Sequence, residues 1–257
     1  MFRALDTQEH VENRLLSSLS AEERTHLEPS MKYVTLTLGQ VIYECSEQID
    51  YVYFPTTCVV SLLYTMRDGS TAEMALAGND GIVGIASFLG GGNIPHLAVA
   101  QIAGHALKMP ARVLQQEFRR GGQLQQILLR YTQALITQIS QTAVCNRLHP
   151  LEQRLCRWLL LCHNRLNRSE IPMTQEIIAN MLGGRRESVT VAAGRLQDAR
   201  LIHYSRGHIT VLNREGLEAM ACECYQIVDD ELNRLVGTQR SRCNSSLSLL
   251  KLSGRVI

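Results

Sequence analysis

The stretch from Thr174 to Ile202 constrains the fold of this chain more than any other, because it predicts two helices joined by a glycine turn. Thr174 precedes a run whose apolar residues share one helical face, and its hydroxyl can cap the helix by accepting a free backbone N–H. Gly183 and Gly184 end the run, since glycine readily adopts the left-handed conformation of a sharp turn. The sequence therefore predicts a helix-turn-helix.

The second helix of this pair has an apolar face and a polar start. Its apolar residues recur at spacings of three and four, which suits packing on the first helix; they are Val189, Ala192, Ala193 and Leu196. A recognition helix enters the DNA major groove by its N-terminal residues. The residues expected to contact DNA are Thr174, Arg185, Arg186, Glu187, Ser188 and Thr190.

Two of these side chains suit base reading. Arginine can pair bidentately with guanine, and glutamate can accept a hydrogen bond from cytosine, so Arg186 and Glu187 are expected to read bases. Arg185 and Ser188 are expected to hold phosphates.

Two short strands, 202–204 and 209–211, follow around an Arg206-Gly207 turn, and Asn213 is expected to cap a final helix that begins near Arg214. Such a hairpin is typical of the wing of a winged helix-turn-helix. The alternative is an ordinary helical hairpin with a solvated arginine pair. The order of glycine turn, polar helix start and wing favours DNA binding.

The net charge of +2 is unevenly distributed. Residues 151–257 carry an excess of basic side chains, whereas residues 1–150 carry an acidic excess, so the positive charge lies where phosphate contacts would need it. The N-terminus does not resemble a signal peptide, and no apolar run approaches the ~20 residues of a membrane span. We therefore expect a cytoplasmic protein without a membrane partner.

Eight cysteines, at positions 45, 58, 145, 156, 162, 222, 224 and 243, raise the question of a metal or redox site. Their spacings do not match a zinc finger or ribbon. Cys222 and Cys224, placed on one helix, would direct their thiols to different faces. The expectation is free thiols, mostly buried, and no metal site.

The N-terminal half reads as many short strands, which suggests a β-barrel or jelly roll. A short helix and turn are expected over residues 9–28. The expected strands are 34–38, 41–43, 51–54, 59–64 and 71–76, with one or two more within 99–109.

A helical region starts at residue 110, and residues 123–148 lack proline and glycine. Leu124, Leu128, Tyr131 and Leu135 follow a heptad register, which predicts a dimerisation helix, although the pattern weakens towards Thr142. The alternative is a helix that lies on its own barrel. His149-Pro150 should end this helix before another begins at Leu151.

A jelly roll, a long helix and a winged helix-turn-helix, in this order, resemble the Crp/Fnr superfamily of bacterial transcription regulators. The residues that carry the resemblance are 186–189, 201–202 and 206–209, with 39–43 and 49–54 in the barrel. The resemblance implies an α+β fold with a cyclic-nucleotide-binding-like barrel over 1–117 and a dimerisation helix over 118–149. A winged helix-turn-helix over 150–235 and a tail over 236–257 would complete the chain.

The resemblance also implies function. It implies a homodimer that binds two-fold symmetric double-stranded DNA, with recognition helices roughly 34 Å apart. Arg206 and His208 of the wing would add DNA contacts, and RNA polymerase would be a partner.

The chain departs from the cyclic-nucleotide binders of this superfamily in Gly78–Gln101. Gly84 matches their glycine, but Ile85 replaces the ribose-binding glutamate, and the segment contains no lysine or arginine. A phosphate without a cationic partner loses its charge-assisted hydrogen bonds, so we expect no cAMP or cGMP binding in the usual pose.

Cofactor binding is not expected either. An iron–sulfur oxygen sensor would need cysteines before Cys45, and the chain has none there. Haem ligands could come from His96, His105, Cys45 or Cys58, but their spacing selects none of them. Cys45 and Cys58 could instead respond to oxidation. The ligand of the barrel is left open.

The sequence contains no glycine-rich phosphate loop, nucleophile elbow or HExxH motif, so we expect no enzyme. A DNA-binding regulator is the favoured function. The alternative is a sensor or interaction module that acts through dimerisation or a partner, with an unidentified ligand or a redox stimulus.

Overall fold

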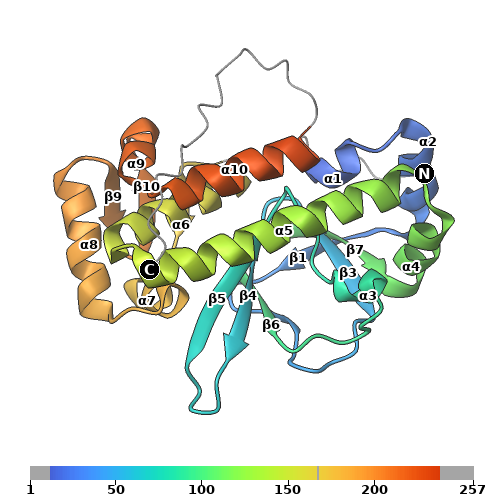
Figure 1. The fold of residues 1–257 in the computed structure, drawn as a ribbon, viewed down its shortest axis with the longest axis horizontal. Helices are drawn as coiled ribbons and strands as arrows, with labels where there is room; N and C mark the ends of the chain where they lie inside the picture. The colour runs from blue at the N-terminus through green and yellow to red at the C-terminus, as the bar shows by residue number, and fades with distance from the viewer. Residues whose placement is uncertain (1–11, 167, 238–257) are drawn as a thin grey trace, which may run out of the picture.

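The computed structural model describes residues 12–166 and 168–237, which form a β domain, a long helix and a C-terminal winged domain (Figure 1). This arrangement confirms the predicted α+β fold. Within the described residues, no helix is long and apolar enough to cross a membrane.

Two antiparallel sheets make up the β domain. One has the order β1-β7-β3, formed by Lys32–Leu36, Gly104–Pro110 and Tyr51–Pro55. The other has the order β2-β6-β4-β5, formed by Val41–Tyr43, Leu97–Ile102, Val59–Thr65 and Thr71–Ala77. The predicted strands are confirmed with small shifts at their ends, and the segment 99–109 contributes to two strands, β6 and β7. Inward-facing apolar side chains of both sheets share one core, as expected for a jelly roll.

Short helices flank the sheets. The helix expected over 9–28 is two helices, α1 (Arg14–Ser17) and α2 (Ala21–Leu27), followed by a 3₁₀ turn at Glu28–Ser30. They are separate because Ser20 accepts a hydrogen bond from the backbone N–H of Glu23 and so caps a new helix. The helix α3 (Ala86–Leu89) follows β5, and α4 (Ala111–Arg120) follows β7. The expected domain boundary at residues 117/118 therefore falls inside α4.

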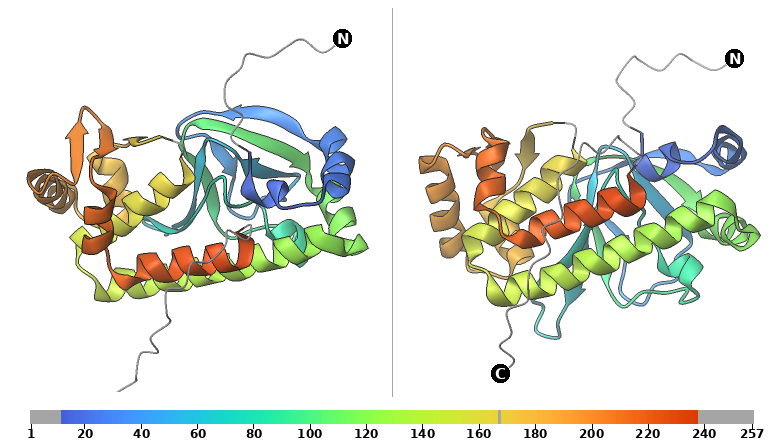
Figure 2. Two further views of the ribbon diagram at one scale, coloured as in Figure 1. Left: turned by 90° about the horizontal axis from the view of Figure 1, so that it is seen from above. Right: turned by 45° about the horizontal axis from the view of Figure 1, so that its top comes forward.

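The long helix α5 (Gly122–Leu148) lies along the barrel, and α10 (Glu223–Val236) lies antiparallel beside it (Figure 2). The four residues predicted for a dimer seam are all buried inside the single chain; they are Leu124, Leu128, Tyr131 and Leu135. Their heptad spacing reflects packing of α5 on its own chain, which was the alternative interpretation. The apolar side chains that α5 exposes are Leu129, Ile136, Val144 and Leu148.

The winged domain begins with α6 (Leu151–Arg165), which lies between the barrel and the rest of the domain (Figure 1). It continues with α7 (Gln175–Leu182), α8 (Arg186–Asp198) and a small sheet of order β8-β10-β9. The sheet strands are Glu170–Pro172, His208–Val211 and Ile202–Ser205. The predicted helix-turn-helix and wing are confirmed as structural elements.

The helix that begins near Arg214 is present, but it is not the last helix. Asn213 caps α9 (Arg214–Met220) by accepting from the backbone N–H of Gly216, as expected. The backbone leaves the helical conformation at Ala221 and Cys222, and α10 then starts in a new direction. As a result α10 contacts mainly α5, while Tyr225 and Val228 near its start pack in the same cluster as α6.

The barrel and α6 share a hydrophobic core. Val59, Leu63 and Leu76 of the barrel pack in one cluster with Trp158 and Leu159 of α6. A buried ion pair crosses the same boundary, with Arg165 Nη2 3.0 Å from Asp80 Oδ2. The two domains are therefore held in a defined relative position.

Candidate nucleic-acid interface

The helix-turn-helix is held by the interactions that the sequence predicts. Thr174 Oγ1 accepts from the backbone N–H of Ile177 at 3.3 Å, which caps α7. Gly183 has a φ of 59°, the left-handed conformation that ends α7. The apolar stripe of α8 is buried against the domain core. Packing of this stripe leaves the opposite face of α8 to solvent.

The start of α8 belongs to this exposed face. Arg185, Arg186, Glu187 and Ser188 are all exposed, and α8 lies at the outer edge of the molecule (Figure 1). Arg185 occupies the N-cap position, and no side chain caps the helix there. The first backbone N–H groups of a helix lack acceptors within the helix and carry a partial positive charge. This end of α8 therefore suits a phosphate group.

Two threonines support this surface. Thr190 Oγ1 lies 2.8 Å from Gln175 Oε1, so α7 and α8 are linked across the turn. The Thr174 hydroxyl accepts the capping bond and still has its own hydrogen to donate. Both side chains are exposed beside the start of α8.

Val191 was missed by the sequence analysis. Its side chain is 54% exposed, one helical turn after Glu187 on the outer face of α8. An exposed apolar side chain on a recognition helix suits contact with a thymine methyl group. The sequence did hold an indication that Val191 is exposed. Val191 follows Glu187 by four residues, so it lies on the same face as Glu187 and not on the buried stripe.

The wing is a tight hairpin. Arg206 and Gly207 have φ angles of 49° and 79°, so both turn residues are left-handed, as a two-residue hairpin of this kind requires. Arg206 and His208 are exposed. His208 Nδ1 lies 2.7 Å from Glu170 Oε1, so a DNA phosphate would compete with this carboxylate for the imidazole.

The barrel has a small apolar cavity at the segment that corresponds to a cyclic-nucleotide cassette. Its volume is about 50 Å³, well below the roughly 300–1,000 Å³ of ordinary small-molecule sites. No lysine or arginine lines it; the lining residues are Tyr43, Leu62, Met74, Ile82, Val83, Gly84, Ile85, Ile94, His96, Leu135 and Ile139. Gly84 has a φ of 107°, and an added Cβ would lie 2.7 Å from the Tyr43 hydroxyl. The glycine therefore serves close packing here.

The four side chains considered as haem ligands or redox groups differ in their exposure and in their partners. Cys45 is exposed, whereas Cys58 is buried and donates to the backbone oxygen of His105 at 3.2 Å. Burial raises the pKa of the Cys58 thiol to about 12, which leaves it protonated and unreactive. His96 stacks edge-on against Tyr64, and burial lowers its pKa. Within the described residues, these four side chains do not form one ligand group.

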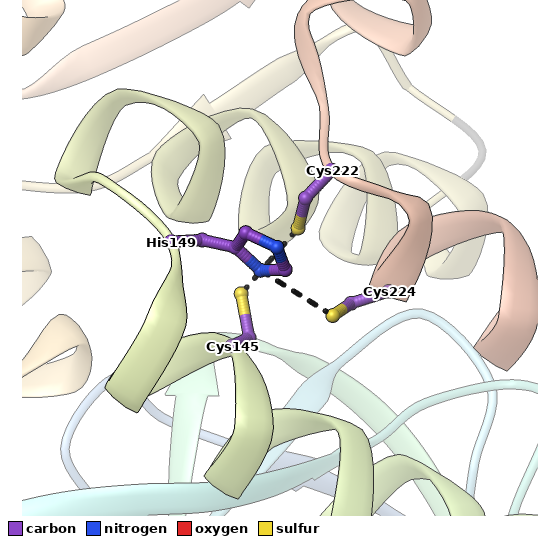
Figure 3. Close-up of side chains that lie close together, drawn as sticks. All are labelled: Cys145, His149, Cys222 and Cys224. Carbon is purple, nitrogen blue, oxygen red and sulfur yellow. Dashed lines mark hydrogen bonds between the residues drawn. The ribbon is translucent and has the colours of Figure 1, made fainter. Parts of the chain in front are cut away.

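The structure instead brings together four other side chains that the sequence analysis did not associate. Ligand atoms of Cys145, His149, Cys222 and Cys224 all lie within 4.8 Å of one another (Figure 3). The expectation that Cys222 and Cys224 direct their thiols apart is wrong, because Cys222 precedes α10 as its N-cap and helical periodicity does not place its side chain. The spacing of the cysteines in the sequence had led us to expect no metal site.

Two family models match the chain. The cyclic nucleotide-binding domain matches residues 33–120, and the Crp-like helix-turn-helix domain matches residues 153–220. No curated protein sequence matches the chain closely.

Solved structures share the fold. FixK2 from Bradyrhizobium japonicum is 20% identical with a TM-score of 0.65, over 75% of this chain and 98% of that one. A putative Crp/Fnr regulator from Eubacterium rectale is 16% identical with a TM-score of 0.59, over 81% and 99%. A putative cAMP-binding regulatory protein from Silicibacter pomeroyi is 21% identical with a TM-score of 0.57, over 80% and 94%.

The fold and the two family models together place this chain in the Crp/Fnr superfamily of DNA-binding transcription regulators. The superfamily is a class of regulators and not of enzymes.

Proposed function

We propose that this protein binds a two-fold symmetric operator as a homodimer and reads it with the start of α8. The observation that carries the proposal is the exposure of Arg185, Arg186, Glu187 and Ser188 at an uncapped helix N-terminus. Arg186 and Glu187 read bases, while Arg185 and Ser188 hold phosphates.

Further contacts flank the recognition helix. Thr174 and Thr190 border the start of α8, and Arg206 and His208 of the wing reach the adjacent backbone. Val191 adds an apolar contact in the groove. RNA polymerase is a further proposed partner, on the basis of family membership alone.

The second copy of the chain docks on the exposed face of α5. Leu129 and Ile136 are 47% and 53% exposed, and with Val144 and Leu148 they form a stripe along the helix. Crp/Fnr regulators act as dimers, and a stripe of this spacing suits helix pairing. The predicted seam residues then support the dimer indirectly, by holding α5 on its own barrel.

The barrel acts without cAMP. Its cavity is lined by apolar side chains, and the cassette offers no cation for a cyclic phosphate. A buried phosphate with no charged partner is strongly disfavoured. DNA binding is therefore independent of cyclic nucleotide.

A fluorescence-anisotropy titration with a labelled pool of two-fold symmetric duplexes, at two salt concentrations and with or without cAMP, tests this function. The expected result is selective, salt-sensitive binding that cAMP does not change. Binding that requires cAMP would contradict the proposal that the barrel acts without a cyclic nucleotide. Absence of selective binding in both conditions would favour the interaction-module alternative.

A further inference from the structure

The four side chains of Figure 3 lie where the end of α5 meets the start of α10. Cys145 is in the last turn of α5, and His149 ends that helix. Cys222 caps α10, and Cys224 is in its first turn. The three thiols are buried, and the imidazole is largely covered. Within the described residues, this is the group of histidine, cysteine and carboxylate side chains whose ligand atoms converge.

The separations between these atoms match a tetrahedral ion. Zinc–sulfur and zinc–nitrogen bonds of roughly 2.3 and 2.0–2.1 Å place two sulfur ligands about 3.8 Å apart, and a sulfur and a nitrogen about 3.5 Å apart. Cys145 Sγ lies 3.5 Å from Cys222 Sγ, and Cys224 Sγ lies 3.6 Å from His149 Nδ1. Little movement would bring all four atoms onto one ion.

The histidine is also oriented for a metal. Its Nδ1 faces the thiols, while its Nε2 lies 3.5 Å from Glu223 Oε1. Metal-binding histidines usually donate their second ring N–H to a carboxylate or carbonyl, which fixes the tautomer and raises ligand basicity. The exposed Glu223 carboxylate is near enough to take that place with a small side-chain movement.

Two arginines lie near the thiols. The Arg157 guanidinium interacts electrostatically with both Cys145 and Cys224, and Arg154 with Cys145. The Nε atoms of both arginines are buried without a hydrogen-bond partner. Three thiolates and one divalent cation carry a net charge of −1. The two arginines would offset this negative charge, which would otherwise be buried without a partner.

We propose that Cys145, His149, Cys222 and Cys224 bind one Zn²⁺ ion in a closed structural site. Thiolate and imidazole ligands in a tetrahedron suit zinc. An iron–sulfur cluster fits less well, because its ligands bind different irons and must be farther apart than the ligands of one ion. A Cys145–Cys222 disulfide would leave Cys224 and His149 without a role.

The ion would join the end of α5, and the turn into α6, to the start of α10. That junction connects the barrel side of the molecule to the winged domain. Because binding of the ion favours the state in which these segments are together, it stabilises α10 along α5.

Zinc content and cobalt substitution of the full chain test the site. We expect about one zinc per chain by mass spectrometry of reduced protein. Replacement with Co²⁺ should give the visible absorption of tetrahedral cobalt and strong thiolate-to-cobalt charge transfer. Chelation should lower Tm on the order of 5–10 °C. The proposal is overturned if the chain holds no zinc and shows no cobalt–thiolate band. It is also overturned if the purified protein shows the visible absorption of an iron–sulfur cluster, or if it contains a Cys145–Cys222 disulfide.

Variants separate metal binding from folding. Cys224→Ser should lose most of the bound zinc, whereas Cys162→Ala, at a buried cysteine of α6 outside the site, should retain it.

His149→Cys keeps four ligands, so it should bind cobalt with charge transfer increased by about a third. Glu223→Gln should lower zinc affinity by about tenfold. Equal zinc content in Cys224→Ser and Cys162→Ala, or unchanged charge transfer in His149→Cys, would exclude the proposed ligands.

Discussion

Glu73 is a carboxyl group buried where the barrel meets the DNA-binding domain. Its oxygens accept hydrogen bonds from Ser61 Oγ at 2.5 Å and from Trp158 Nε1 at 2.9 Å. Burial raises its pKa from 4.5 to about 7, although these two hydrogen bonds and the nearby arginines act in the opposite direction. The native state therefore holds this proton more tightly than the unfolded chain does.

The contribution of Glu73 to stability should consequently fall as pH rises from about 4.5 to about 7. In that range the native state binds more protons at Glu73 than the unfolded state, so the free energy of unfolding decreases by about 3 kcal/mol in total. Glu73→Gln cannot ionise and should lack this contribution. Urea unfolding of both proteins at pH 5 and pH 8 measures it, and an identical pH dependence in the two would show that Glu73 does not titrate as described.

The burial of Glu73 and its hydrogen-bond partners could not have been predicted from the sequence. Glu73 lies in a strand with ordinary alternation, and its partner Trp158 is 85 residues away. By contrast, the polar start of α8 could be predicted, because capping, glycine turns and apolar spacing are local properties.

At the scale of elements, α5 has more than one apolar face. Its heptad pattern correctly predicts a long helix, but the pattern alone does not say which structure covers the apolar residues. The barrel and α10 bury Leu124, Leu128 and Leu135, and Leu129 and Ile136 are left exposed. The position of α10 could not be derived, because it depends on contacts such as that between Cys145 and Cys222, which are 77 residues apart.

The exposed face of α5 supports a specific test of dimerisation. Ile136→Glu should weaken the dimer by at least about tenfold, because a charge buried in a helix seam has no partner there. Sedimentation over a range of protein concentrations measures the change. Leu89→Glu is the matched control, since Leu89 is 50% exposed on α3. Equal dimer mass in both variants would show that the dimer uses another surface.

The barrel and the DNA-binding domain form a continuous structure. The ion pair between Asp80 and Arg165 lies in this boundary, with side chains only 3% and 2% exposed. Arg165 also donates to the backbone oxygen of Leu161 and to Gln138 of α5, so one guanidinium connects three parts of the fold.

Removal of the Asp80 carboxylate should therefore be strongly destabilising. Asp80→Ala leaves Arg165 as a buried charge without its ion-pair partner, which costs about 3–5 kcal/mol of unfolding free energy. Urea denaturation measures this loss. Asp68→Ala, at an exposed aspartate of the β4–β5 turn, should remain near wild type. A similar small effect for both variants would mean that the buried pair contributes little.

The start of α8 is proposed to read DNA sequence, and the substitution Arg186→Ala separates base reading from phosphate binding. Fluorescence anisotropy on a selected operator and on a scrambled duplex should show affinity for the operator reduced about 5- to 150-fold, with a much smaller loss on the scrambled duplex. Arg119→Ala, at an exposed arginine of α4, should bind like wild type. An equal loss on both duplexes would make Arg186 a phosphate contact only, and no loss on either would contradict the assignment of α8 as the recognition helix.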